Sequence, residues 1–270
     1  MTSASNSTRD RPRWLYPVAY CLLVVLLSLP VRAERAFAPQ DTQQVILALL
    51  QVAIDPYRHL APIFHLATLL LIVLIALRGR AIGRTLAAYI GLNYLVIALA
   101  QSFGRTEAYG LVLQSGALIS SLLLGVVWLR AALRATLAPS FRQVPPWRYG
   151  LLPLALLAFW APYDAQLRPN FDPLLLLNSA DYGLTFCLTT PVFLYLLILF
   201  YPHVDPLAYR LTALNGLLYG LINMTHFAEP SRVWMGVLHL PLLILSLIAL
   251  LLPRLAARRE TGAMPSEEQP

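Results

Sequence analysis

The chain has 270 residues, of which 58% are hydrophobic and only 12% are charged. Soluble domains are about 45–50% apolar and about 25% charged, so this composition excludes a soluble enzyme, a secreted disulfide domain and a disordered chain. All 20 basic residues are Arg, and the formal net charge is +7. Without Lys, no mechanism that needs a lysine Schiff base is available.

Cys21 and Cys187 both lie in apolar stretches, which argues against a structural disulfide or a Cys-rich metal site.

The apolar residues gather in eight stretches that are separated by short polar connections. Each stretch is near the roughly 20 residues that a helix needs to cross a hydrocarbon core. The sequence therefore predicts an all-α, multi-pass membrane protein with eight transmembrane helices. The predicted spans are about 14–32, 60–78, 84–103, 109–131, 147–163, 180–201, 207–227 and 233–253.

The distribution of Arg predicts the orientation of these spans. If the N-terminus is inside, 14 of the 20 Arg lie in inner segments, whereas 8 of the 13 acidic residues lie in outer ones. The positive-inside rule then places both termini in the cytoplasm and the protein in the cell (inner) membrane. The basic charge reflects this topology and some attraction to anionic lipid. No nucleic-acid-binding motif accompanies it, so no nucleic-acid partner is predicted.

The two halves of the chain carry similar landmarks in the same order. This order predicts a 4+4 internal repeat whose two copies have the same orientation. The first-half landmarks are Trp14-Leu15-Tyr16, Gly91-Leu92-Asn93-Tyr94 and Gly110-Leu111-Val112-Leu113-Gln114. The corresponding second-half landmarks are Trp147-Arg148-Tyr149, Gly216-Leu217-Leu218-Tyr219 and Gly236-Val237-Leu238-His239. The predicted division is a first repeat at 1–138, an inner linker at 139–146, a second repeat at 147–256 and a disordered cytoplasmic tail at 257–270.

The N-terminus has a second interpretation. Basic residues from Arg9 to Arg13, an apolar run, and the sequence Val31-Arg32-Ala33 are also typical of a signal peptide and its cleavage site. Removal of this segment would leave one repeat without its first helix. The repeat therefore favours retention of the first span, and the sequence leaves its cleavage open.

An additional helix is predicted in the first outer connection, at residues 41–54. Asp41, followed three residues later by Gln44, is typical of a capping box, and Asp55-Pro56 ends the helix. Its apolar face at helical spacing consists of Val45, Ala48, Leu49, Val52 and Ala53. This pattern indicates an interfacial helix on the outer leaflet, with a lid over a cavity as the alternative.

Polar side chains within the predicted spans lie mainly in their outer halves, and the inner halves are almost purely apolar. This asymmetry indicates a pocket that opens outward over an apolar floor. The predicted ligand-binding residues are His65, Gln114, Asp181, Asn223, His226 and His239. Ionisable groups in a bilayer are commonly functional. Polar residues in membrane helices also form interhelical hydrogen bonds, and Asp181 has the alternative role of capping the sixth helix with Asn178 and Ser179.

The sequence gives little support for a metal-binding site or a catalytic nucleophile. His65, His226 and His239 could converge from three helices, but the chain has no His-x-x-x-His or Cys-x-x-Cys spacing. We therefore predict no metal site, and the sequence identifies neither a cofactor nor catalytic residues. The run Ser115-Gly116-Ala117 resembles the nucleophile helix of rhomboid proteases. Leu113 stands where that family has Gly, and the Gly-rich later helix that bears its His is absent.

Each half also resembles the EXPERA domain of emopamil-binding proteins and sigma-2-type receptors. The resemblance rests on four spans with an outer loop that ends in Asp-Pro, at Asp55-Pro56 and Asp172-Pro173. No predicted span contains the Glu that those isomerases place there. The resemblance therefore implies binding of an amphipathic or sterol-like ligand and not catalysis.

Three functions follow, and we favour the first. The protein binds or transports a small molecule or lipid through an outward-facing intramembrane pocket. Alternatively, it is an accessory or assembly subunit with membrane-protein partners, and the polar residues serve only as interhelical contacts. The third hypothesis is an intramembrane enzyme.

Overall fold

The computed structural model describes residues 14–164, 166–179 and 181–262, and these residues are mostly helical. A helix lies in each of the eight predicted spans. They are α1 (Leu15–Leu27), α3 (Ala61–Arg78), α4 (Gly83–Gln101), α5 (Ser115–Leu133), α6 (Leu152–Trp160), α8 (Phe186–Phe200), α9 (Pro206–Asn223) and α10 (Val233–Gly262). Short 3₁₀ helices occupy Pro39–Asp41, Asp55–Leu60, Gly79–Ile82, Phe141–Gln143, Pro146–Leu151, Met224–Ala228 and Pro230–Arg232.

Within the described residues, three helical stretches are long and apolar enough to cross a membrane. They are Pro39–Gln101, Ser115–Leu133 and Pro230–Ala256. In contrast, α1 has 13 residues, α6 has 9 and α8 has 15, which are fewer than the roughly 20 that a spanning helix needs. The prediction of eight spans therefore stays a prediction.

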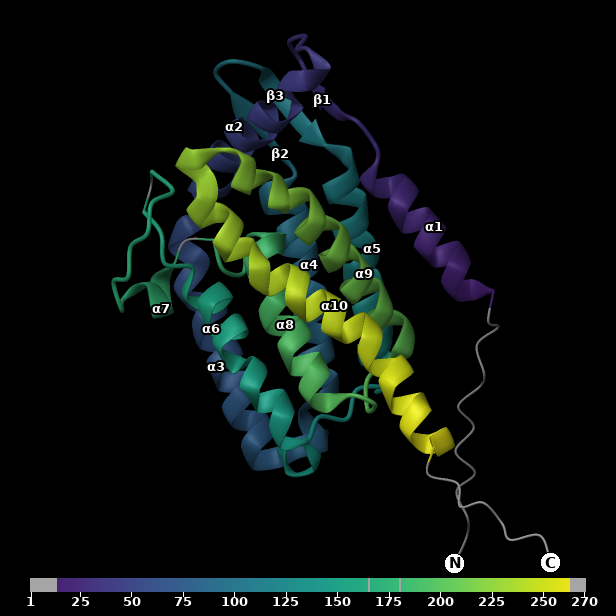
Figure 1. Cartoon of the computed structure of the whole chain (residues 1–270). Helices are drawn as coiled ribbons and strands as arrows, with labels where there is room; N and C mark the ends of the chain where they lie inside the picture. The colour runs from purple at the N-terminus through teal and green to yellow at the C-terminus, as the bar shows by residue number, and fades with distance from the viewer. Residues whose placement is uncertain (1–13, 165, 180, 263–270) are drawn as a thin grey trace, which may run out of the picture.

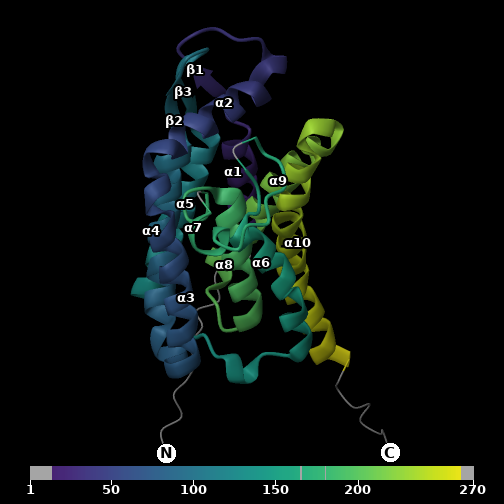
Figure 2. The ribbon, with the colours of Figure 1, turned by 90° about the vertical axis from the view of Figure 1, so that its left-hand side faces the viewer.

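Helix α8 forms the centre of the bundle. Nearly all of its side chains are buried, and Figure 2 shows it between the α3–α4 pair and α10. Its sequence, from Phe186 to Phe200, is apolar apart from Thr189 and Thr190, as expected for a helix that contacts protein all round. The main core surrounds it and includes Trp128, Tyr94 and Tyr209.

A small antiparallel sheet at one end of the bundle is the main departure from the all-α prediction (Figure 1). Its strands are β1 (Val31–Ala33), β2 (Phe103–Thr106) and β3 (Gly110–Gln114), in the order β1-β3-β2. The predicted first span, to residue 32, and fourth span, from 109, are therefore wrong at the ends that meet in this sheet. An apolar strand joined directly to an apolar helix has the composition of one longer span. The candidate cleavage site lies in β1, which pairs with β3.

Helix α2 (Thr42–Ile54) agrees with the predicted outer helix and packs against this sheet. Val45, Leu49 and Ala53 form a small core with Val112 of β3. The predicted capping box is wrong, because the residue before the helix makes no side-chain capping bond. Packing on the sheet therefore fixes the orientation of α2 within the protein.

The sixth predicted span begins later than expected. Residues 181–185, here termed the pre-α8 turn, are not helical, and α8 begins at Phe186. Gly183 in this turn has a φ of +83°, and a Cβ there would collide with Cγ of Phe64. A residue with a side chain fits neither this backbone nor this space, so the turn depends on glycine. The short helix α7 (Leu175–Asn178) precedes the turn.

Connections that the sequence assigns to the same side of the membrane contact one another. On the predicted inner side, Arg80 donates to Gln143, and the Ala138 N–H donates to the carbonyl of His203. On the predicted outer side, Nε2 of Gln43 donates to Oγ1 of Thr225. In Figure 1, α1 begins and α10 ends toward the end of the bundle opposite the sheet.

One pair of repeat landmarks is not equivalent in the structure. Residues 110–114 form strand β3, whereas 236–239 lie within α10. The 4+4 repeat and its domain boundaries stay predictions. Helix α10 continues to Gly262, into the predicted tail, and residues 263–270 lie outside the described part of the chain.

Candidate functional site

His65, on α3, is fully buried, and both of its ring nitrogens have partners. Nδ1 lies 2.9 Å from the carbonyl oxygen of Ala61, and Nε2 lies 3.0 Å from Oγ of Ser179. Nε2 also lies 3.2 Å from the carbonyl oxygen of Phe159. A carbonyl only accepts, so each ring nitrogen faces a carbonyl to which it donates in one tautomer of the neutral ring, and Nε2 faces the serine hydroxyl as well. The ring also packs against Phe159 and Tyr182, with centroid distances of 4.7 and 4.6 Å. His65 thus joins α3 to α6 and to the segment before α8.

Further buried hydrogen bonds hold the pre-α8 turn against α3 and α4. Oγ1 of Thr68 lies 2.9 Å from the hydroxyl of Tyr89 and 2.8 Å from that of Tyr182. Asn93 donates from Nδ2 to the carbonyl oxygen of Gly183 at 3.0 Å. These polar groups satisfy each other across helices, which is the structural role that membrane bundles give to such residues.

Asp181 lies in the same turn and does not cap α8. Its carbonyl oxygen accepts from the N–H groups of Leu184 and Thr185 at 3.1 and 2.9 Å. The residue before α8, Thr185, makes no side-chain capping bond, so the capping role expected for Asp181 is wrong. Within the described residues, Oδ1 of Asp181 is buried and has no hydrogen-bond partner.

His226 and His239, here termed the histidine pair, lie together where the end of α9 meets α10. Their ring centroids are 5.4 Å apart, and each side chain is 6% exposed. Nδ1 of His239 lies 2.6 Å from the carbonyl oxygen of Met235 and therefore donates to it. In the described part of the chain, Nδ1 of His226 is buried without a hydrogen-bond partner. Asn223, at the end of α9, donates to Sγ of Cys187 at 3.5 Å.

A cavity of about 420 Å³ lies between the end of α1 and the rest of the bundle; we term it the α1 cavity. Small-molecule sites have volumes of about 300–1,000 Å³. Its lining residues are Leu27, Ser28, Leu29, Pro30, Val31, Phe37, Pro39, Thr42, Ile46, Gln114, Gly116, Ala117, Tyr219 and Ile222. Gln114 is its one predicted site residue, and no side-chain hydrogen bond of Gln114 occurs among the described residues.

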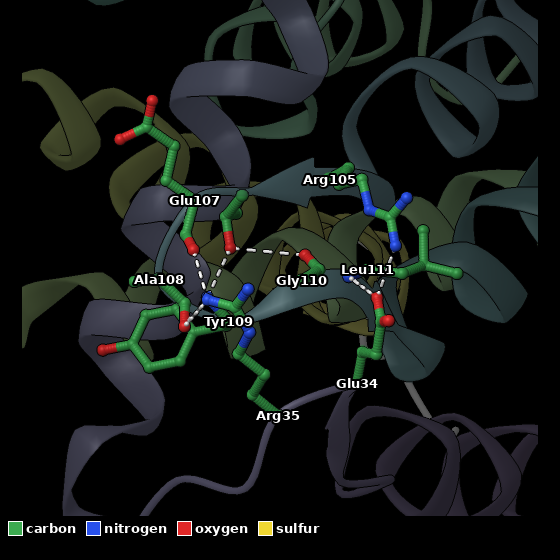
Figure 3. Close-up of polar contacts among 9 residues, drawn as sticks. Glu34, Arg35, Arg105, Glu107, Ala108, Tyr109, Gly110 and Leu111 are labelled. Atoms are coloured by element: carbon green, nitrogen blue, oxygen red, sulfur yellow. Dashed lines mark hydrogen bonds and ion pairs between the residues drawn. The ribbon is translucent and has the colours of Figure 1, made fainter.

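A second cavity, of about 320 Å³, lies at the other end of the β1–β3 ladder (Figure 3). Glu34 accepts a hydrogen bond from the N–H of Leu111 at 3.0 Å and pairs with Arg105 at 2.9 Å. The Leu111 N–H, followed by Arg105, lowers the pKa of Glu34 below its usual value. Arg35 donates from Nη1 to the carbonyl oxygen of Glu107 at 2.7 Å. These bonds fasten the segment after β1 to the β2–β3 turn.

The structure does not bring the six predicted residues together. His65 and Asp181 belong to or adjoin the pre-α8 turn, His226 and His239 form the histidine pair, Asn223 donates to Cys187, and Gln114 lines the α1 cavity. Among the described residues, no three His, Cys, Asp or Glu side chains form a group that could hold a metal ion. The ligand-binding role of the six residues therefore stays a prediction. Comparisons of the chain with protein-family models, with curated proteins and with solved structures find no match.

Proposed function

We propose that this chain is an integral membrane protein that binds a small amphipathic molecule or a lipid in the α1 cavity. The observation that carries the proposal is the cavity itself, which is mostly apolar and has a volume suited to a small molecule. We assign Gln114 the role of bonding the polar part of the ligand. Transport of the ligand is a further step that the cavity permits and does not require.

The exposed side chains of α3 support a position in the membrane. The face of α3 that points away from the bundle consists of large apolar residues that are between 52% and 76% exposed, namely Ile63, Leu66, Leu70, Val73 and Leu77. Monomeric soluble proteins rarely expose a continuous apolar patch of this kind. We propose eight crossings of the cell (inner) membrane, with the sheet outside and the Arg-rich connections inside.

The position of the cavity supports a ligand that arrives from the bilayer. Ile222 of α9 lines the cavity and is also 56% exposed, so the cavity reaches the apolar surface. On the other side, Val18 and Val25 of α1 are 53% and 59% exposed. An apolar chain can therefore enter between α1 and α9 without crossing water, while a polar group reaches Gln114.

Close packing of α1 on α5 fixes one wall of the cavity. A Cβ at Gly116 would lie only 2.7 Å from the carbonyl oxygen of Leu26. Glycine therefore lets the end of α1 approach the start of α5. Tyr219 of α9 supplies the opposite wall, so both halves of the chain line the cavity.

Two neighbouring residues of α9 provide a matched test. Ile222 lines the cavity and Leu221 does not, yet they are 56% and 54% exposed. We expect Ile222→Trp to reduce the bound lipid or small molecule detected by native mass spectrometry at least fivefold, because the indole fills the mouth of the cavity. Leu221→Trp should leave the amount of bound lipid or small molecule unchanged.

The same spectra separate the proposal from its rival. If the wild-type protein has no bound small molecule and copurifies with a stoichiometric partner chain, the accessory-subunit hypothesis replaces ligand binding. Equal occupancy in both Trp variants would also overturn the assignment to the α1 cavity. A Gln114→Leu variant adds a third observation, since we expect it to release ligands with polar headgroups before purely apolar ones.

A further inference from the structure

We propose that the histidine pair binds one soft, monovalent metal ion, copper(I), through Nδ1 of His226 and Nε2 of His239. This site is separate from the α1 cavity and does not depend on the function proposed for it. The supporting observations are the distance between the rings, the hydrogen bonds of their nitrogens, and two methionines close to them in sequence.

The ring distance suits a shared ion. An imidazole nitrogen lies roughly 1.1 Å from its ring centroid, and metal–nitrogen bonds are about 2.0 Å. Two rings that share one ion therefore have centroids no more than about 6 Å apart. The observed separation of His226 and His239 is 5.4 Å, at an interplanar angle of 35°.

The hydrogen bonds leave one nitrogen on each ring for the ion. Nδ1 of His239 donates to the carbonyl oxygen of Met235, so its Nε2 bears the lone pair. Metal-binding histidines usually donate their other ring N–H to a carbonyl or carboxylate in this way. Nδ1 of His226, buried and unpartnered among the described residues, is the second nitrogen. A buried polar atom without a partner costs free energy, which a bound ion would recover.

The composition of the surroundings favours copper(I) over other ions. The described residues place no third His, Cys, Asp or Glu beside the pair, whereas zinc sites usually have four ligands. Of the four Met in the chain, Met224 precedes His226 by two residues and Met235 precedes His239 by four. Thioether sulfur selects copper(I). Positions four apart also share one helix face, which places Met235 beside His239.

The test uses the purified full-length protein in mild detergent without oxygen. Copper(I) is titrated in competition with the coloured chelator bicinchoninate. We expect one copper(I) per chain, and at least a tenfold weaker affinity in both His226→Leu and His239→Leu. Met224→Leu should weaken binding less. The matched control is His203→Leu, because His203 lies at the opposite end of the bundle and should not affect binding.

A measurement on the unmodified protein keeps the test independent of how the variants fold. X-ray absorption at the copper edge should show two nitrogen ligands at about 2.0 Å. The proposal is overturned if the wild-type protein binds no copper(I), or if both His variants bind it as tightly as the wild type. Tighter binding of zinc than of copper(I) in the same competition would overturn the choice of ion.

Discussion

The two buried histidine environments differ in how completely their polar atoms are satisfied. Both ring nitrogens of His65 have protein partners, on α3 and on the segment before α8. At the histidine pair, one nitrogen of His226 has no partner among the described residues. A histidine ring whose two nitrogens are both hydrogen-bonded stabilises the fold and has no free nitrogen for a ligand. A buried ring nitrogen without a partner lowers stability and is free to bind a ligand. Burial alone therefore does not distinguish a structural histidine from a functional one.

The largest expected effect concerns the pre-α8 turn. Gly183→Ala should lower the free energy of unfolding by on the order of 3 kcal/mol or more, because the new Cβ would meet Phe64 and the φ is positive. Gly150→Ala is the control, since nothing lies within 4 Å of its Cβ position. Unfolding in mixed detergent micelles measures both. Equal stabilities would mean that the turn does not have this conformation.

The histidine comparison itself predicts a difference in stability. His65→Leu should cost about 2 kcal/mol, because it removes the ring's hydrogen bonds to Ser179 and to the carbonyl oxygen of Phe159 in a buried site. His239→Leu in metal-free protein should cost less than about 1 kcal/mol, since it removes a bond only to its own helix. The same unfolding assay compares them. A larger loss for His239→Leu would reverse our assignment of the structural and the functional histidine.

Two variants that each remove one buried hydroxyl test the same distinction between hydrogen-bonded and unpartnered groups, with smaller expected losses of stability. Thr68→Val removes a hydroxyl that bonds both Tyr89 and Tyr182, and should cost about 1–2 kcal/mol. Ser121→Ala removes a buried hydroxyl that has no partner in the described part of the chain, so stability should be unchanged or slightly higher. Thermal unfolding of both variants in one detergent gives the comparison. Similar losses would show that partner satisfaction is not what stabilises the region.

The smallest effect concerns the exposed hydrogen bond and ion pair of Glu34 with Leu111 and Arg105 at the sheet. The pKa of Glu34 is lowered in the folded protein, so its stabilising contribution is present above the unfolded pKa and is lost as the pH falls through the folded one. The amide nuclear magnetic resonance signal of Leu111 should therefore titrate with a midpoint below the usual Glu value of about 4.3. Glu34→Gln should abolish the titration. A midpoint at or above the usual value would contradict the hydrogen bond.

Periodicity and length predicted some elements closely and missed others for a physical reason. The span predicted at 60–78 is α3 at Ala61–Arg78, and the helix predicted at 41–54 is α2 at Thr42–Ile54. Strand β3 was missed because its apolar residues continue into α5. Leu111, Val112 and Leu113 are all apolar, so the alternation of exposed Leu111 with buried Val112 leaves no period-two signal in the sequence.

The candidate site was less accessible to sequence reasoning than the helices. The depth of His226 and His239 in their spans correctly suggested that they lie near the same end of the bundle. The partners of His65 could not be foreseen, because they come from α6 and from a turn that was expected to be helical. The α1 cavity depends on where α1 ends and on the packing of β1, and neither follows from composition.

The central claim, that the α1 cavity binds an amphipathic ligand, is tested most directly by photo-crosslinking in nanodiscs. A lipid that bears a diazirine near its polar end is activated, and the labelled peptides are identified by mass spectrometry. We predict saturable labelling of residues 27–31 and of the α9 segment around Tyr219 and Ile222, competed by unlabelled lipid. Labelling confined to the exposed face of α3, without saturation, would contradict the account.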